Sequence, residues 1–367
     1  MVGDVDHLAI YAWIYLQQFT KHRSKRGTGL KAVYYERSRS IRVGNCLPVC
    51  PARDQVQLRV SFCGICGTDL HLFQGHLDHR IRIPQVFGHE MSGTVAAVGE
   101  NVKGYASGDH VTVRPLDPCG ACPACRAGHS HVCQNLKVLG VDAPGALQVL
   151  WTVPAQTLHR LPMSLPLDVA ALVEPLAVAC HDVRLVDLKS GEYVVVQGGG
   201  PIGTLIALVA RAVGAEVLIS EVNPFRLQLA RELGFQALSP KEVDVARYVA
   251  DRTKTAGADV IFEVTGSAAG AESMTQLARV RGRIVIVAIF SESPKVNLFQ
   301  CFSRELQLLG ARVYERKDFE QAIGLAASGE FPLQRLISDV CSLDQVEPAL
   351  RQLESGGEVM KILVQCS

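Results

Sequence analysis

The sequence predicts an α/β protein in which a β-rich module is combined with a doubly wound parallel sheet. With 367 residues the chain is too long for one ordinary core, so we expect two domains. From Leu30 to about Leu161, short Val, Ile and Leu runs are punctuated by Gly, Pro and Asp, which is typical of β-strands and turns. From Glu192 onward, apolar strands alternate with helical segments, as in a parallel sheet.

Composition narrows the class of protein. Hydrophobic residues make up 48% and charged residues 20%, which is typical of a globular chain. With 37 basic and 36 acidic residues, the chain has no excess of basic residues of the kind that indicates nucleic-acid binding. The apolar run from Leu8 to Leu16 is too short to cross a bilayer. The 12 cysteines, without a visible cleavable signal peptide, favour a reducing compartment and metal-bound thiolates, so we expect a cytoplasmic location.

Residues 1–29 differ from the rest, because they lack strand alternation and end in the basic stretch Lys25 to Gly29. We expect a poorly ordered extension here; a short amphipathic helix is the alternative. The natural start is expected near Leu30, which sequencing the N-terminus of protein made from the native gene would check.

Within the β-rich part, Cys66 and His89 lie in the stretches Cys63–His71 and Phe87–Gly93. A thiolate, an imidazole and the neighbouring carboxylate of Glu90 form a ligand set that suits Zn²⁺. Three protein ligands with a fourth position left open are typical of a catalytic zinc site. A lone Gly-His-Glu is a weak signal, so its weight depends on the motifs that follow.

The strongest local motif is a C-x2-C-x2-C-x7-C spacing formed by Cys119, Cys122, Cys125 and Cys133. Four thiolates without an open position indicate a structural zinc that holds a loop in shape. Four cysteines can also hold an iron–sulfur cluster. The x3-Cys-Pro ending of a ferredoxin run is missing, so we expect zinc.

A helix with Pro175 in its first turn follows Glu174. The Glu174 carboxylate could point back at the first metal, or it could be an ordinary helix-start acid that the dipole favours.

An apolar strand from Glu192 to Gln197 then runs directly into Gly198-x-Gly200-x-x-Gly203, and a helix follows from Thr204 to Val213. Glu221 ends the next strand, 23 residues beyond Gly198, near the spacing at which a carboxylate meets the ribose hydroxyls. Gly200 lets the backbone approach a pyrophosphate, and the helix N-terminus offers free N–H groups. These features predict dinucleotide binding.

Further strands and a returning segment complete the expected order. Strands are expected at 259–264, 283–287 and 306–310, which gives a sheet of about six strands. A helix at 319–327 and a last strand at 360–364 are expected to return to the first module.

Together these motifs resemble the zinc-containing medium-chain dehydrogenase/reductase family over about nine-tenths of the chain, from Leu30 to the end. The resemblance is carried by five motifs in the family's order: Gly64–His71, Gly88-His89-Glu90 with Gly93 and Gly99, the four-cysteine lobe, Glu174–Ala177, and the glycine loop. It implies a GroES-like β domain at 30–175 and 316–367 and a Rossmann domain at 176–315.

The resemblance also implies roles for single residues. Cys66 and His89 are expected to bind the catalytic zinc, with Glu90 or Glu174 as the remaining protein ligand or as a carboxylate on the bound water. Thr68 resembles the hydroxyl that takes the substrate's proton, and His71 the outer end of that relay. For NAD, the expected contacts are Gly198, Gly200, Pro201, Ile202, Gly203, Glu221 at the adenosine ribose and Arg226 over the adenine. An acid at the ribose repels a 2′-phosphate, which favours NAD over NADP.

Glu174-Pro175-Leu176-Ala177 has the form of the polyol, sugar and threonine dehydrogenase branch. The resemblance thus implies a small-molecule substrate, a secondary alcohol of a polyol, sugar or sugar acid, with L-threonine as the alternative. Arg312 and Tyr314 are expected to face it. A dinucleotide-binding protein that has lost catalysis is the alternative of another class. A homodimer or homotetramer is expected, joined through a Rossmann edge strand at 295–299.

Overall fold

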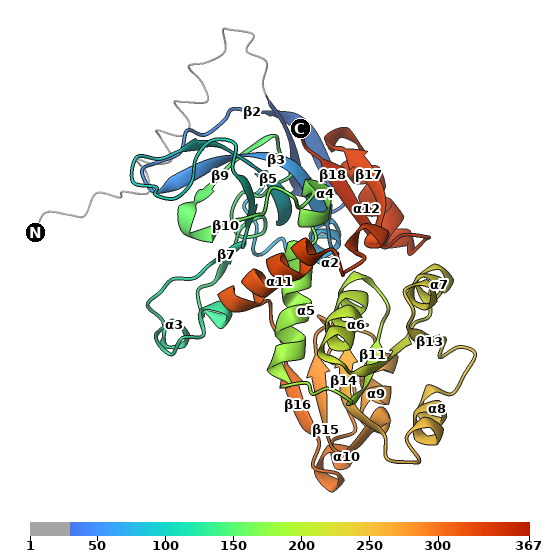
Figure 1. Cartoon of the computed structure of the whole chain (residues 1–367). Coiled ribbons are helices and arrows are strands. Elements are labelled where there is room, and N and C mark those ends of the chain that lie inside the picture. The colour runs from blue at the N-terminus through green and yellow to red at the C-terminus, as the bar shows by residue number, and fades with distance from the viewer. Residues whose placement is uncertain (1–29) are drawn as a thin grey trace, which may run out of the picture.

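The computed structural model describes residues 30–367, so the expectations for residues 1–29 lie outside the described residues. The chain forms a β-rich part, which holds both ends of the described segment, and a parallel-sheet part between them (Figure 1). No helix within residues 30–367 is long and apolar enough to cross a membrane.

The β-rich part is built on a seven-stranded sheet with the order β10-β6-β5-β3-β18-β17, in which β9 also pairs with β3. Its ladders are antiparallel except for the parallel pair β17–β18. The last strand thus lies beside β3, in the interior of the sheet. The strands are β3 Gln55–Ile65, β5 Glu90–Val98, β6 His110–Val113, β9 Leu150–Pro154, β10 Leu158–Arg160, β17 Ile337–Ser342 and β18 Lys361–Gln365.

Smaller elements surround this sheet. A three-stranded sheet has the order β2-β1-β4, and the pair β7–β8 frames a lobe that contains the short helix α3. Helix α2 follows β3 directly and packs against α12. Their bounds are β1 Leu30–Arg37, β2 Ser40–Cys46, β4 Gln85–Val86, β7 Leu116–Asp117, β8 Lys137–Val138, α2 Gly67–Phe73, α3 Pro123–Arg126 and α12 Val346–Ser355.

The second part is a six-stranded parallel sheet with the order β13-β12-β11-β14-β15-β16. Its strands are β11 Tyr193–Gln197, β12 Glu216–Ser220, β13 Gln236–Leu238, β14 Ala258–Glu263, β15 Ala278–Ile286 and β16 Gln307–Gly310. The helices between them are α6 Pro201–Val213, α7 Pro224–Glu232, α8 Val245–Arg252, α9 Ala268–Leu277 and α10 Leu298–Ser303. The strand order reverses between β11 and β14, which is where doubly wound folds bind nucleotides.

Two long helices join the parts: α5 Val173–Leu185 and α11 Arg316–Ser328 pack against each other (Figure 1). At their contact the buried Asp318 carboxylate accepts hydrogen bonds from Arg184 Nε at 2.6 Å and Nη2 at 2.9 Å, and it lies 2.9 Å from His181 Nδ1. Burial opposes ionisation, but the Arg184 and His181 contacts hold the pKa of Asp318 well below its usual value. The carboxylate is therefore ionised and ties the two helices together.

The predicted fold class is confirmed, and the predicted strands are present with boundary shifts of a few residues. The sheets support a division into a GroES-like domain at 30–175 and 316–367 and a Rossmann domain at 176–315, which we propose. One expected strand is wrong: 295–299 contains no strand and runs into α10, and the two edge strands of the sheet are β13 and β16.

Candidate active site and metal centres

Cys66 and His89 meet at the start of α2. Cys66 is the N-cap residue, and its sulfur accepts a hydrogen bond from Thr68 N at 3.2 Å, while the Asp69 carboxylate accepts one from Cys66 N at 2.9 Å. His89 lies immediately before β5, and its Nε2 is 3.2 Å from Cys66 Sγ. Two residues 23 positions apart are thus brought within reach of one ion.

Two buried carboxylates complete this cluster. Glu90 begins β5 and Glu174 lies in the first turn of α5, and ligand atoms of both lie with one from His89 within 4.8 Å of one another. Thiolate, imidazole and carboxylate are the ligand types of a catalytic zinc site. The predicted ligands therefore form two groups that share His89, one with Cys66 and one with Glu90 and Glu174.

Each carboxylate has its own buried partner. Lys361, on β18, donates to both oxygens of Glu90, at 2.9 and 2.6 Å. Tyr314, which is 0% exposed, donates its hydroxyl to Glu174 Oε1 at 2.6 Å. Tyr314 therefore points at the carboxylate cluster. Lys361 was not predicted at all, because nothing in the local sequence links it to Glu90.

The electrostatics of this cluster fit a divalent cation. Burial and the neighbouring Glu90 raise the pKa of Glu174 to about 7, although the nearby His89 acts to lower it. Burial disfavours the imidazolium of His89, yet the neighbouring Cys66 and Asp69 raise its pKa well above its usual value. A positive ion would stabilise the thiolate and carboxylates that burial otherwise disfavours.

Asp69 is a second site residue that the sequence reasoning missed. Within residues 30–367 its Oδ1 atom is buried without a hydrogen-bond partner. It lies 3.6 Å from His89 Nδ1, which is also buried and has no hydrogen-bond partner in that range. A metal-bound histidine commonly donates its other N–H to a carboxylate, which fixes the orientation of the ring. A small adjustment would make this bond once an ion occupies Nε2. The available signal was the position of Asp69, three residues after Cys66.

The two predicted relay residues lie on α2. Thr68 and His71 are both partly exposed, and no side-chain bond joins them within residues 30–367. His71 Nδ1 instead lies 3.3 Å from Nδ1 of His76. Burial and the nearby His76 lower the pKa of His71, so a proton that reaches it is readily released.

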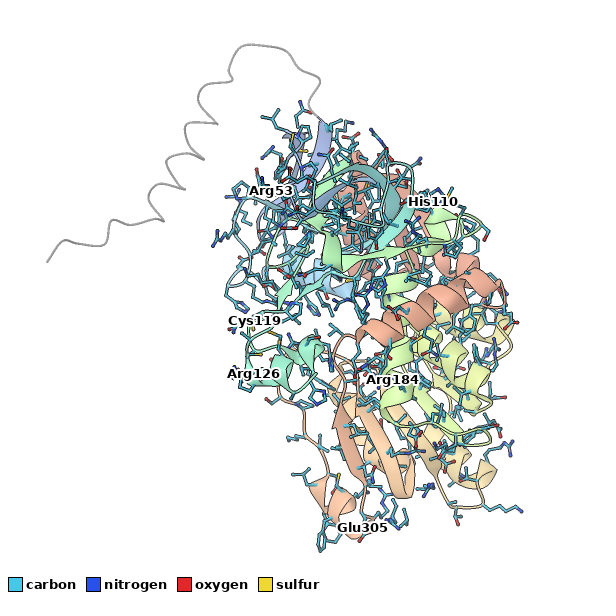
Figure 2. All side chains as sticks on the ribbon, turned by 60° about the vertical axis from the view of Figure 1, so that its left-hand side comes forward. Arg53, His110, Cys119, Arg126, Arg184 and Glu305 are labelled. Carbon is cyan, nitrogen blue, oxygen red and sulfur yellow. The ribbon has the colours of Figure 1, made fainter. Side chains whose placement is uncertain are left out.

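The four lobe cysteines form a separate cluster on a projecting lobe (Figure 2). One sulfur from each of Cys119, Cys122, Cys125 and Cys133 lies within 4.8 Å of the other three. Backbone N–H groups point at the sulfurs, for example Asn135 N at 3.3 Å from Cys133 Sγ. Donors from Ala121 and Cys122 lower the pKa of Cys119 to about 6. This arrangement is typical of a structural thiolate–zinc site.

The glycine loop follows β11 and begins α6. Gly198 has φ 101°, and a Cβ on Gly203 would lie 1.8 Å from Gly198 O, so both positions require glycine. Glu221 accepts hydrogen bonds from Gly199 N, Val222 N and Asn223 N at 2.7, 2.6 and 2.7 Å. A Cβ on Gly200 would meet only the Arg226 guanidinium, at 3.5 Å.

The start of α6 lies directly after this loop. Pro201 and Ile202 begin α6, and the first N–H groups of a helix have no partner within it, which suits them to an anion. Glu221 and Arg226 thus both lie beside the glycine loop, Glu221 through its bond from Gly199 N and Arg226 next to Gly200.

Comparisons with known proteins agree with this geometry. Family models match at residues 52–163, described as an alcohol dehydrogenase GroES-like domain, and at 201–328, described as a zinc-binding dehydrogenase. The chain is 52% identical to 2-dehydro-3-deoxy-L-galactonate 5-dehydrogenase of Pseudoalteromonas atlantica, over 92% of this chain and 98% of that protein.

Two further proteins are similar at lower identity. An L-threonine 3-dehydrogenase of Pyrococcus horikoshii is 39% identical over 65% of this chain and 70% of that protein. A zinc-binding dehydrogenase of Sinorhizobium meliloti, solved with NADP bound, matches with a TM-score of 0.87 and 33% identity, over 92% of this chain and 100% of that one.

Proposed function

The chain belongs to the zinc-containing medium-chain dehydrogenase/reductase family, and we propose that it oxidises the C5 hydroxyl of a 2-keto-3-deoxy sugar acid. It is a zinc-dependent oxidoreductase that transfers a hydride from a secondary alcohol to NAD. The observation that carries the finer proposal is the 52% identity to a galactonate-type dehydrogenase over 98% of its length. In this reaction the alcohol becomes a ketone, NAD⁺ becomes NADH and one proton is released.

For the catalytic zinc we propose Cys66, His89 and Glu174 as ligands. Among the described residues, Lys361 donates to both oxygens of Glu90, whereas Tyr314 donates only to Oε1 of Glu174 and leaves Oε2 available. A zinc ion held there would supply Lewis-acid polarisation of the alcohol oxygen. Glu90, neutralised by Lys361, would remain a carboxylate near that position. Cys119, Cys122, Cys125 and Cys133 would hold the structural zinc.

Proton removal is proposed to follow α2. The Thr68 hydroxyl would accept the alcohol proton, and His71 would pass it to the surface. The lowered pKa of His71 suits release of the proton rather than storage.

For cofactor binding we propose the glycine loop from Gly198 to Gly203, with Pro201 and Ile202 at the helix start. Bound NAD would supply the hydride acceptor. Glu221 would face the adenosine ribose and disfavour a 2′-phosphate, and Arg226 would cover the adenine.

A substrate screen tests this function. We expect NADH formation, followed by absorbance, with 2-keto-3-deoxy aldonates, and at least about tenfold lower kcat/KM with polyols or L-threonine, because one polar contact discriminates by about 1.4 kcal/mol or more. NADP⁺ should be used less well than NAD⁺. Turnover of threonine above the sugar acids would instead favour the amino-acid alternative, and no turnover of any alcohol would favour the non-catalytic one.

We also propose a homodimer built on the β16 edge of the Rossmann sheet. Within the described residues β16 pairs on one side only, and the adjacent α10 exposes Leu298, Phe299 and Phe302, the last at 80%. An unpaired strand beside an apolar patch favours pairing with a second copy across a two-fold axis. Light scattering should give a dimer, or a tetramer made from it, and Phe302→Glu should shift the mass toward the monomer. A monomeric wild type would contradict this.

For the location we propose the cytoplasm. All 12 cysteines lie within residues 30–367 and none of them forms a disulfide there, and thiolate zinc sites are suited to a reducing compartment.

A further inference from the structure

Two histidines face each other at the end of α2. Nδ1 of His71 lies 3.3 Å from Nδ1 of His76, and the centroids of the two rings are 5.6 Å apart. His76 is exposed and His71 is partly exposed, so an ion in the solvent can reach both nitrogens. The pair therefore lies at the outer end of the proposed proton path.

The backbone at the end of α2 brings the two rings together. Gly75 has φ 85°, its N–H donates to Leu72 O at 2.8 Å, and His76 N donates to His71 O at 3.0 Å. These two bonds around a left-handed glycine form a Schellman motif, in which the side chains of the first and sixth residues of the turn commonly make a hydrophobic contact. Here both positions are histidines, so the contact pairs two nitrogen ligands.

The segment that joins β1 to β2 holds this turn in place. Arg39 N donates to Phe73 O at 2.6 Å, and Ser38 Oγ donates to Gln74 O at 3.0 Å. A Cβ on Gly75 would lie 2.8 Å from Ser38 Cβ, so the turn requires glycine. The two imidazoles are thus carried by a backbone with little freedom to separate them.

The distance between the two nitrogens suits a metal ion. A tetrahedral zinc ion with Zn–N bonds of about 2.0–2.1 Å places two ligand nitrogens about 3.3 to 3.4 Å apart. One ring can also donate its N–H to the other at 3.3 Å, and an ion would replace this single bond with two ligand bonds. Burial and the nearby His76 lower the pKa of His71, which keeps its ring in the neutral form that binds metals.

The pair differs from the two metal clusters in its number of ligands. Those clusters bring together three and four ligand atoms, whereas no third His, Cys, Asp or Glu within residues 30–367 offers an atom within 4.8 Å of both Nδ1 atoms. Water would complete the coordination of an ion bound here. Two ligands at an exposed position indicate exchangeable binding of free ions and not a resident metal.

We propose that His71 and His76 form a third zinc site, at which free Zn²⁺ binds reversibly and stops proton release. This inference rests on the proposed function, because it uses the relay role of His71. A neutral imidazole that binds a metal through Nδ1 carries its proton on Nε2 and has no lone pair left for another proton. His71 could then accept no proton from Thr68.

The test dialyses the enzyme, with its resident zinc ions, against rising concentrations of free Zn²⁺. Bound zinc is counted by mass spectrometry, and NADH formation is followed at the same concentrations. We expect one further ion per subunit, bound saturably, and a fall in kcat of up to about 100-fold, the lower end of what a positioned acid–base group contributes. The residual rate should equal that of His71→Gln, and dialysis against zinc-free buffer should restore the activity.

His76→Gln should keep wild-type activity without added zinc, and it should lose both the further ion and the inhibition. His79→Gln is the matched control, because His79 is an exposed histidine three residues further on and outside the pair. It should bind the further ion and be inhibited like the wild type.

Inhibition that persists in His76→Gln, or a further ion that binds to an active enzyme without inhibiting it, would overturn the proposal. A wild type that oxidises no alcohol defeats the proposed function and the inhibition with it. An active wild type that binds no further ion defeats only this inference.

Discussion

Replacing Cys66 by alanine is expected to remove the catalytic zinc and to lower kcat/KM by more than about 100-fold, because loss of an outer-shell partner alone costs 10- to 100-fold. The Cys66 sulfur lies 3.2 Å from His89 Nε2, and without it the ion keeps only an imidazole and carboxylates. Metal analysis by mass spectrometry should show that one of the two expected zinc ions per subunit is lost. The remaining ion should belong to the lobe.

Cys50→Ala is the control for this variant, because Cys50 is an exposed free thiol outside both clusters. It should retain both ions and full activity. The same analysis separates the two carboxylates: Glu174→Gln should lose the catalytic ion, and Glu90→Gln should retain it. A Cys66→Ala enzyme that keeps both ions, or a reversed result for Glu174 and Glu90, would contradict the ligand set.

Replacing Cys122 by alanine is expected to unfold the lobe. Structural zinc in small thiolate sites contributes about 10–16 kcal/mol of apparent binding free energy, which is as large as the stability of a whole domain. Cys122 also caps α3, so its loss removes both a ligand and the start of the only α-helix in the lobe segment 119–133. Trypsin should then cut at the exposed Arg126, with mass spectrometry to locate the cleavage.

Treating the wild type with a chelator should reproduce this cleavage, and adding zinc back should prevent it. The lobe is expected to affect α5 as well, because the ring of His131 contacts that of His181 on α5, with centroids 5.2 Å apart. Resistance of Cys122→Ala to trypsin, with both ions retained, would show that the cysteines do not hold a metal.

Much of this architecture could be predicted from local patterns. The glycine loop, the strand before it and the helix after it lie in one short stretch, so their spacing in the sequence is also their arrangement in space. The four lobe cysteines are equally local, and the structure brings their sulfurs together as expected. Cys66 and His89 were predicted as partners from their ligand types and from the accompanying motifs.

The residues that hydrogen-bond the carboxylates of the site could not be predicted in this way. Lys361 reaches Glu90 across 271 residues, and Tyr314 reaches Glu174 across 140. Such contacts depend on how β18 and the turn after β16 are placed by the whole fold. The strand expected at 295–299 failed for a related reason, because apolar residues there form the exposed side of α10 and not a ladder.

The position of β18 also determines when folding of the β-rich sheet can be completed during synthesis. This strand pairs with both β3 and β17, and it brings Lys361 to Glu90. The Rossmann sheet is continuous in sequence and can assemble as soon as it leaves the ribosome, since domains fold as units during translation. In the other sheet, β3 lacks its β18 partner until β18 emerges from the ribosome. A nascent chain stalled before Lys361 would therefore present a folded nucleotide-binding half with an incomplete catalytic half.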